Sequence, residues 1–211
     1  MSAIAHHIPD AMMAAYASGN LPHPFAMVVA THVSLCVDCR AALGAHQTVG
    51  GVLLEQSDHV ATSANLKSDL MALLDEPVRP DPVYDRQGVY PGPVMEALKG
   101  KPPRWKKLGM GVKQCLLSEV DGGSTRLLYI PSGQAVPDHS HNGLELTLVL
   151  QGSFSDETGR FGIGDVEIAD EDLEHTPIAD AGEACICLAA TDAPLRFSAL
   201  MPRLLQRFFR I

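Results

Sequence analysis

A histidine and two cysteines near the N-terminus have the types and spacing of metal ligands. His32, Cys36 and Cys39 stand four and three residues apart. Each interval is about one helical turn, so the three side chains can converge on one point. Imidazole and thiolate are the ligands that Zn²⁺ prefers, and a closed structural site needs four of them. The histidines available in this half of the chain as the fourth ligand are His6, His7, His23 and His46.

A bound zinc ion would also stabilise the N-terminal part of the chain, which contains this motif. Two thiolates balance the two charges of the ion, and a helical domain of about 75 residues gains folding free energy from a bound metal. Two alternatives remain open. The three residues can be ordinary packed helix residues, or Cys36 and Cys39 can form a redox pair, although a thioredoxin-type pair usually follows a strand.

A second set of candidate ligands lies in the C-terminal half. His139, His141 and Glu145 are separated by even intervals, so on a strand they share one face, toward the interior of a barrel. His175, from a distant segment, would complete the set. Three imidazoles and a carboxylate suit zinc, manganese, iron or nickel. The alternative is that these histidines line a barrel without a metal.

A third candidate group is the C-x-C pair Cys185 and Cys187. Residues two apart on a strand share a face, but a direct disulfide between them would be strained. The pair can be thiols that react with an oxidant near the barrel metal, or two small buried residues of a core strand. Both interpretations stay open, whereas Cys115 is expected in the core.

The elements that must position these residues differ between the two halves of the chain. Before residue 76, apolar residues recur at helical spacing and predict four helices. Their expected extents are Pro9 to Tyr16, a helix after Pro24, Cys36 to about Leu54, and Asp58 to Leu74 with Ser57 or Asp58 as N-cap. The last carries an apolar stripe of Leu66, Leu70, Leu73 and Leu74 that predicts a partner surface.

The remainder of the chain predicts a linker and a β domain. Seven of the 15 prolines fall between Asp75 and Pro103, so residues 76–103 are expected to be a Pro-rich linker. From residue 104, short alternating runs separated by glycines and acidic turns predict an antiparallel barrel or sandwich. The fold class is therefore α+β in two domains, with boundaries at 1–75 and 104–211.

Composition excludes several classes of protein. Of the 211 residues 46% are hydrophobic, which excludes a mainly disordered chain. The formal charge of -9 gives no general attraction to nucleic acid or anionic lipid. The longest apolar runs are far shorter than the roughly 20 residues that cross a bilayer, and the N-terminus lacks the pattern of a secretory signal. We therefore expect a protein of the reducing cytoplasm, without a disulfide framework.

The motifs resemble two known domains. A histidine near the N-terminus followed by H-x-x-x-C-x-x-C and a helical segment is similar to the zinc-binding anti-sigma domain. In that family four helices occlude the core-polymerase-binding surfaces of an extracytoplasmic-function sigma factor. Carried over by position, this resemblance implies that the zinc ligands are His7, His32, Cys36 and Cys39.

The second constellation resembles the first cupin motif in full, from Gly133 through the two histidines and Glu145 to Gly152. The second cupin motif matches at Gly164 and His175. It departs where a cupin has proline, glycine and asparagine and this chain has Asp170, Asp172 and Ala179. Together the two resemblances cover nearly the whole chain and point to the ChrR-type zinc anti-sigma factors, whose helical domain is followed by a cupin-like domain.

This resemblance implies a function. The chain would be a cytoplasmic anti-sigma factor rather than an enzyme, with two zinc ions, and would form a heterodimer with an extracytoplasmic-function sigma factor. Release would follow singlet oxygen or organic hydroperoxide stress through the cupin-like domain. The main alternative is a metal-dependent cupin enzyme, a dioxygenase or isomerase, with a zinc-stabilised accessory domain. A zinc-dependent DNA-binding repressor is disfavoured by the acidic N-terminal half.

Overall fold

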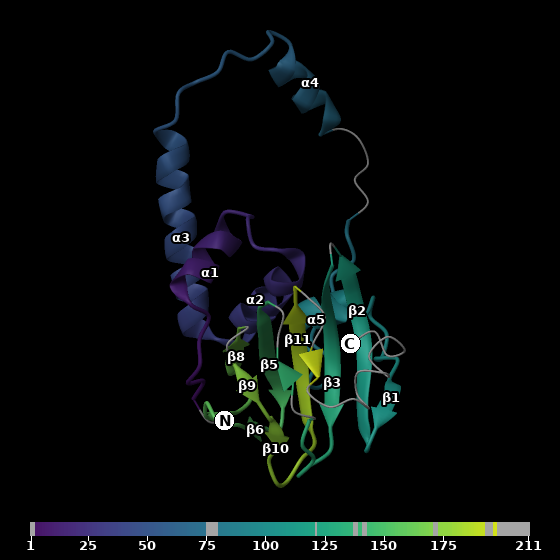
Figure 1. Ribbon diagram of the computed structural model, residues 1–211. Coiled ribbons are helices and arrows are strands. Elements are labelled where there is room, and N and C mark those ends of the chain that lie inside the picture. Colours follow the sequence, from purple (N-terminus) through teal and green to yellow (C-terminus); the bar gives the residue numbers. More distant parts are fainter. Residues whose placement is uncertain are drawn as a thin grey trace.

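The computed structural model describes residues 3–74, 80–120, 122–136, 139–140, 143–170, 173–192 and 196–197. Within these residues the chain forms helices, then strands (Figure 1). The helices are α1 Asp10–Ala17, α2 His23–Leu35, α3 Val37–Glu55, α4 Leu66–Leu73 and α5 Gly92–Ala97. The strands are β1 Lys106–Gly109, β2 Val112–Val120, β3 Gly123–Ile130, β4 His139–Ser140, β5 Glu145–Gln151, β6 Phe154–Ser155, β7 Arg160–Phe161, β8 Val166–Ala169, β9 Glu174–His175, β10 Ile178–Ala179, β11 Cys185–Thr191 and β12 Arg196–Phe197.

Three of the four predicted N-terminal helices lie where the sequence places them. Pro9 is the extended N-cap of α1, and Pro24 stands in the first turn of α2, where the missing amide hydrogen is no loss. The prediction for the fourth helix is wrong in extent, since α4 begins at Leu66 after Asn65 and not near Asp58. Ser57 and Asp58 are therefore not its cap, because the chain between α3 and α4 is not helical.

The β domain is built from one large antiparallel sheet and two small ones. The large sheet has the strand order β1-β2-β3-β11-β5-β8, and the small sheets are β10-β6-β7 and β12-β4-β9. Alternation along β5 divides the core in two. Leu146 and Leu148 belong to one buried cluster, while Val149 belongs to another that also contains Cys185 and Cys187. The second cluster lies inside the sandwich, and the predicted α+β class is confirmed.

The other face of the large sheet is covered by helices. α2 packs against β2, β3, β5 and β11 and also against α5. Val28 and Val29 of α2 are fully buried, in the same cluster as Leu146 and Leu148. This burial is the main hydrophobic contact between the two halves, so the helical half and the barrel share one core.

The stretch predicted as a linker is partly folded. It contains α5, whose Val94 and Met95 are buried. Gln87 and Tyr90 pair across a tight turn just before this helix. Residues 87–98 are therefore packed structure, because their apolar side chains find room against α2.

One part of the helical half extends away from the sheet and from the helices packed on it. Figure 1 shows the outer part of α3 and all of α4 rising away from the sheet as two limbs joined by a loop. We refer to residues 49–74 as the arch. No residue of α4 is buried. The arch exposes the large apolar side chains of Val49, Val52, Leu53, Leu54, Val60, Leu66, Leu70, Met71, Leu73 and Leu74.

No single helix in the described ranges is long and apolar enough to cross a bilayer. α2 and α3 meet that test only when taken together, and they are bent by 117° relative to each other.

Candidate metal centres

Four side chains converge where the junction of α2 and α3 meets the segment that precedes α1. One potential ligand atom from each of His7, His32, Cys36 and Cys39 lies within 4.8 Å of the others. Nδ1 of His7 is 3.4 Å from Sγ of Cys36 and 3.5 Å from Sγ of Cys39. The structure thus brings together the four residues that the family resemblance implies as zinc ligands. We call this group the helical cluster.

A junction between two helices creates the cluster. His32 is in the last turn of α2, Cys36 stands between α2 and α3, and Cys39 is in the first turn of α3. Cys36 has extended backbone and serves as N-cap of α3, where its sulfur accepts the amide hydrogen of Cys39. The side chains therefore converge at a sharp bend, and not along one face of a continuous helix.

His32 is held in one orientation. Its Nδ1 is 2.9 Å from the carbonyl oxygen of Gly164. A carbonyl only accepts, so Nδ1 carries the hydrogen and Nε2 keeps the free lone pair. Nε2 is buried and has no hydrogen-bond partner among the residues that the structure describes. Burial lowers the pKa of His32, which favours the neutral imidazole that binds metals.

The other N-terminal histidines lie elsewhere. The ring of His6 packs on Phe161 at 4.5 Å between centroids, and its Nδ1 is 3.6 Å from Oδ2 of Asp165. His46 pairs with Asp10 at 2.9 Å. His7 is consequently the histidine of this segment that faces the thiols.

The helical cluster fits a structural zinc ion. Two imidazoles and two thiols form a complete tetrahedral donor set, with no position left for substrate. The orphaned Nε2 of His32 gives an independent reason, because a buried lone pair without a partner is unfavourable. Burial raises the pKa of Cys39, so without a cation this thiol stays protonated. A bound zinc would stabilise the thiolate and hold the α2–α3 bend.

The barrel ligands predicted from the cupin motif are only partly within the described structure. β4 pairs with β9 so that His139 lies opposite His175. Glu145 is buried at the start of β5, where its carboxylate accepts a hydrogen bond from Thr147. His141 and the side chain of His139 lie outside the described residues. The ligand set of four therefore stays a prediction.

Two carboxylates that were not predicted from the sequence lie beside His175. Nδ1 of His175 is 2.7 Å from Oδ2 of Asp156 and 3.1 Å from Oε1 of Glu167. The three donor atoms lie within 4.8 Å of one another, and we call this group the barrel cluster. One signal in the sequence was Glu167 itself, a charged residue inside an apolar strand. Asp156, in a turn between β6 and β7, gave none.

The charges of the barrel cluster depend on each other. Burial raises the pKa of Glu167. Burial alone would lower the pKa of His175, but the hydrogen bonds and charges of Glu167 and Asp156 outweigh it and raise that pKa. Burial also opposes ionisation of Asp156, but hydrogen bonds from Glu167, His175 and Thr158 hold its pKa well below the usual range. An imidazolium thus sits between acidic partners, with Nδ1 already engaged.

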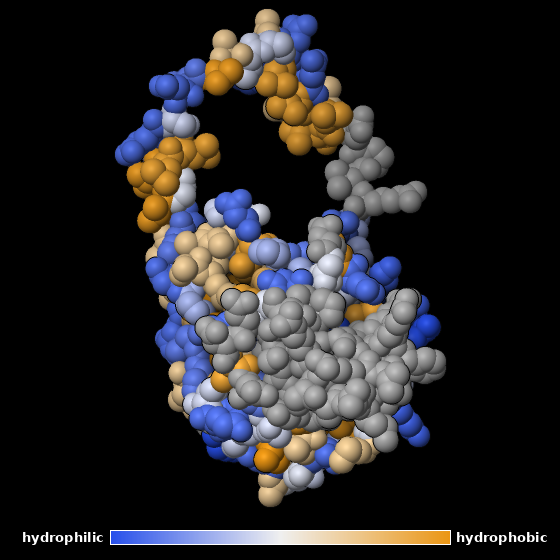
Figure 2. Space-filling model, viewed as in Figure 1, coloured by the Kyte–Doolittle hydropathy of each residue, from blue (hydrophilic) through white to orange (hydrophobic). Residues whose placement is uncertain are grey.

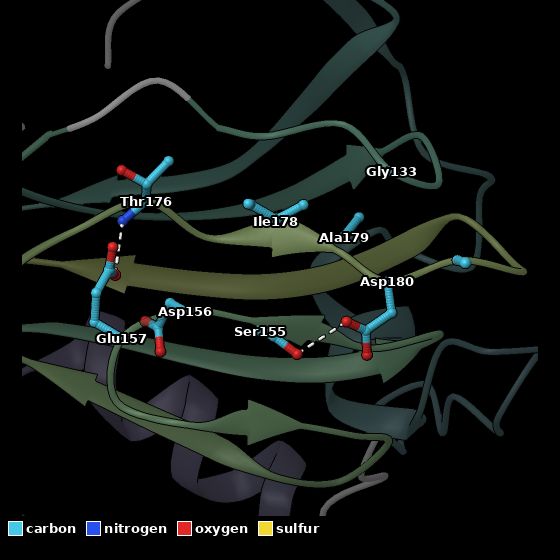
Figure 3. Close-up of a pocket in the computed structure, with 9 residues that line it drawn as sticks. Gly133, Ser155, Asp156, Glu157, Thr176, Ile178, Ala179 and Asp180 are labelled. Carbon is cyan, nitrogen blue, oxygen red and sulfur yellow. Dashed lines mark hydrogen bonds between the residues drawn. The ribbon is translucent and has the colours of Figure 1, made fainter.

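A surface hollow of about 620 Å³ lies next to the barrel cluster (Figure 3). Its lining includes Asp156, Glu157 and Asp180. Glu157 accepts the amide hydrogen of Thr176, and Ser155 donates to Asp180. The acidic groups on its wall are therefore tied into the barrel's own hydrogen bonds.

The C-x-C pair is inside the barrel. Cys185 and Cys187 are buried, with their sulfurs 3.3 Å apart. The hydrogen bond with Cys185 and burial raise the pKa of Cys187, so its thiol is unreactive in this state. Access of an oxidant to these sulfurs would need the barrel to open.

The comparisons with known proteins agree with this two-part architecture. The family model described as "ChrR Cupin-like domain" matches residues 97–193. The anti-sigma-E factor ChrR of Cereibacter sphaeroides is 53% identical over 211 residues, which is 99% of both chains. A crystal structure of Rhodobacter sphaeroides SigE in complex with the anti-sigma ChrR is 51% identical, with a TM-score of 0.81, over 90% of this chain and 99% of that one.

Fold, cluster and similarity together define the class, a His/Cys-containing helical domain packed on a cupin-like barrel. With 53% identity along nearly the full length of both proteins, the chain belongs to the ChrR family of anti-sigma factors.

Proposed function

We propose that this chain binds an extracytoplasmic-function sigma factor in the cytoplasm and keeps it from core RNA polymerase. It acts by forming a heterodimer and does not turn over a substrate. Two findings support the proposal: the 53% identical relative is named an anti-sigma-E factor, and the related ChrR structure is a complex with SigE.

The observation in this chain that carries the proposal is the apolar surface of the arch. Figure 2 shows apolar side chains gathered on the outer end of α3 and on α4, with open space between the two limbs. Leu70 and Leu73 are more than half exposed. Exposed apolar surface of this kind marks a protein interaction site, and two helical limbs can close on a partner from both sides.

The helical cluster has a structural role in this proposal. Zinc bound by His7, His32, Cys36 and Cys39 would fix the bend at which α3 leaves the body. Since α3 is the first limb of the arch, the bend sets the direction in which the apolar surface points. A second zinc would be held in the barrel by His139, His141, Glu145 and His175, whose Nε2 would exchange its proton for the ion while Nδ1 stays with Asp156 and Glu167.

The cupin-like barrel is the part of the chain that responds to oxidative stress. Singlet oxygen or an organic hydroperoxide alters the barrel, through its metal ligands or through the thiols of Cys185 and Cys187, and the altered state binds the sigma factor less tightly. Each 1.4 kcal/mol of difference between the two states changes the affinity about tenfold. A few kcal/mol are therefore enough for release.

The test compares two matched substitutions in the full-length chain. The sigma factor is the one that co-purifies with the wild-type protein from its native host. Leu70→Lys adds a charge to the arch, where the side chain is 53% exposed, and Ile178→Lys adds one to the barrel at 46% exposure. We expect Leu70→Lys to weaken binding by at least about 30-fold, the effect of losing a buried anchor. Ile178→Lys should bind like the wild type.

Two results would contradict the proposal. One is the absence of a stoichiometric sigma factor in the wild-type preparation. The other is equal affinity for the two variants, which would place the partner surface away from the arch.

A further inference from the structure

The loop between β7 and β8 belongs to the barrel but touches the helical cluster. This loop, residues 162–166, makes four hydrogen bonds to the N-terminal half. Gly164 accepts from Nδ1 of His32 at 2.9 Å. Oδ1 of Asp165 accepts the amide hydrogens of Ala5 and His6, and the amide of Val166 donates to the carbonyl of His6.

We propose that the 162–166 loop is the outer shell of the N-terminal metal centre, so that the barrel directly sets the metal affinity of the helical domain. The inference rests on the zinc centre of the proposed function and extends it. The loop fixes which nitrogen of His32 faces the metal and where the segment leading to His7 lies.

The contact with His32 determines the ligand atom. With its hydrogen donated to Gly164, Nδ1 leaves Nε2 as the one lone pair of the ring. Nε2 is buried and has no other partner in the described part of the chain, and His32 is one of the four residues that each offer a ligand atom within 4.8 Å of the others. Metal-bound histidines usually donate their second nitrogen in this way, which orients the ring and raises its basicity.

Asp165 positions the segment that carries His7. One oxygen holds the amides of Ala5 and His6 at 2.7 and 2.9 Å, and the other holds the amide of Gly162 at 2.8 Å. A single carboxylate therefore ties the N-terminal segment to the barrel loop immediately before His7, whose Nδ1 faces the two thiols.

Gly164 is required by its geometry. Its φ is +92°, a conformation that favours glycine, and a Cβ at this position would lie 2.5 Å from Cδ1 of Ile4. The side chain of Ile4 thus occupies the space that any larger residue would need. The close approach lets the carbonyl of Gly164 reach the ring of His32.

The same loop leads to the barrel cluster. Val166 begins β8, and the next residue, Glu167, contacts His175. Three consecutive peptide units thus separate the carbonyl that holds His32 from the carboxylate that holds His175. A displacement of β8 acts on both clusters, and by linkage the coupling of their ligand affinities is reciprocal.

The test measures metal affinity of the full-length protein with cobalt as the probe. Charge-transfer absorption from thiolate to Co²⁺ reports on Cys36 and Cys39, and the part of it that a Cys36→Ser variant loses is assigned to the helical cluster. The variants are Asp165→Ala and Gly164→Ala. The matched controls are Asp180→Ala, a barrel aspartate bound to Ser153 and Ser155, and Gly182→Ala, with φ +123° and nothing near its Cβ position.

We expect each loop variant to lose about 10- to 100-fold in Co²⁺ affinity at the thiolate site, since Asp165→Ala removes an outer-shell contact and Gly164→Ala displaces the carbonyl that holds His32. The controls should keep the wild-type affinity. Equal affinity of loop variants and controls would overturn the inference while leaving the zinc centre intact. Absence of thiolate-to-cobalt absorption in the wild type would overturn both.

A second measurement needs no variant. Long-range ¹H–¹⁵N correlation spectra of the zinc-loaded protein identify the protonated nitrogen of His32. Protonation at Nδ1 with the metal on Nε2 supports the inference, and the opposite assignment contradicts it.

Discussion

In the helical cluster, Nε2 of His32 is buried without a partner among the described residues, whereas in the barrel cluster Nδ1 of His175 contacts two carboxylates. The helical cluster has a complete set of metal-ligand atoms but contains no cationic side chain that they could bind. In the barrel cluster, the carboxylates of Asp156 and Glu167 balance the charge of His175. His32 and His175 are both buried, so the difference lies in the chemistry of their neighbours.

This difference indicates distinct roles. An unsatisfied buried polar group costs about 1–3 kcal/mol, so the helical cluster reaches its stable form when a cation binds. The barrel cluster holds an imidazolium between acids and is stable as it stands. The first arrangement suits a permanent structural ion, and the second suits a region that changes state.

The largest effect is expected from breaking the helical cluster. Cys36→Ser removes a zinc ligand and the N-cap of α3, so one zinc per chain should be lost. Structural zinc contributes much of the stability of small domains, and the unfolding temperature should fall by about 20 °C or more. Metal analysis and thermal unfolding measure both. Cys115→Ser, which alters a buried thiol outside the cluster, should retain its zinc.

Breaking the barrel cluster should lower stability less than losing the structural zinc does. The effect is measured on protein from which the metal has been removed. His175→Ala leaves Asp156 and Glu167 buried without their cation, which should lower the free energy of unfolding by about 3–5 kcal/mol. His46→Ala removes another His–Asp pair, but Asp10 in that pair is 88% exposed, so the change should stay below about 1 kcal/mol. Similar losses in the two variants, measured by denaturant unfolding, would refute a self-neutralised barrel cluster.

Amide hydrogen exchange should differ between α2, which packs on the large sheet, and α4, which lies in the arch. The amides of α2 are in the shared core and should exchange only on extensive unfolding, while those of α4, which has no buried residue, should exchange almost as fast as an unfolded chain. Binding of the sigma factor should slow exchange in α4 and leave α2 unchanged. Protection of α4 in the free protein would show that the arch already has a partner within the chain.

The smallest effect on stability is expected at Asp180, a barrel carboxylate that accepts several hydrogen bonds. Hydrogen bonds from Ser153, Ser155 and Arg160 lower the pKa of Asp180. The folded state therefore binds this proton less tightly than the unfolded state. Its stabilisation is present above the unfolded pKa of about 3.9 and is lost as the pH falls through the folded pKa.

Asp180→Asn should accordingly lower stability by about 1–2 kcal/mol at neutral pH. The difference from the wild type should shrink below about pH 4. Unfolding curves at several pH values test this, and a difference that does not change with pH would contradict it.

Local patterns in the sequence predicted most of the fold. Helical spacing and prolines placed α1, α2 and α3, and the alternating runs after residue 104 predicted an antiparallel β domain. These signals are local because caps and periodicity act within a few residues. The start of α4 was misplaced because that helix has no core contact to reinforce its weak ends.

Local sequence patterns did not predict the contacts between residues that are far apart in the chain. The spacing of His32, Cys36 and Cys39 indicated one cluster, but nothing local indicated that Gly164 would hold His32 across 132 residues of chain. The barrel acids were missed for the same reason. Asp156, in the turn after β6, contacts His175 of β9 although β6 and β9 belong to different small sheets.

The most direct test of the account is run-off transcription by core RNA polymerase with the co-purified extracytoplasmic-function sigma factor. The full-length, zinc-loaded chain is titrated into the reaction. Transcription should fall to background at one chain per sigma factor, and the Leu70→Lys variant should leave it nearly unchanged at that ratio. Transcription that persists at a large excess of the wild-type chain would contradict the claim that this protein is an anti-sigma factor acting through its arch.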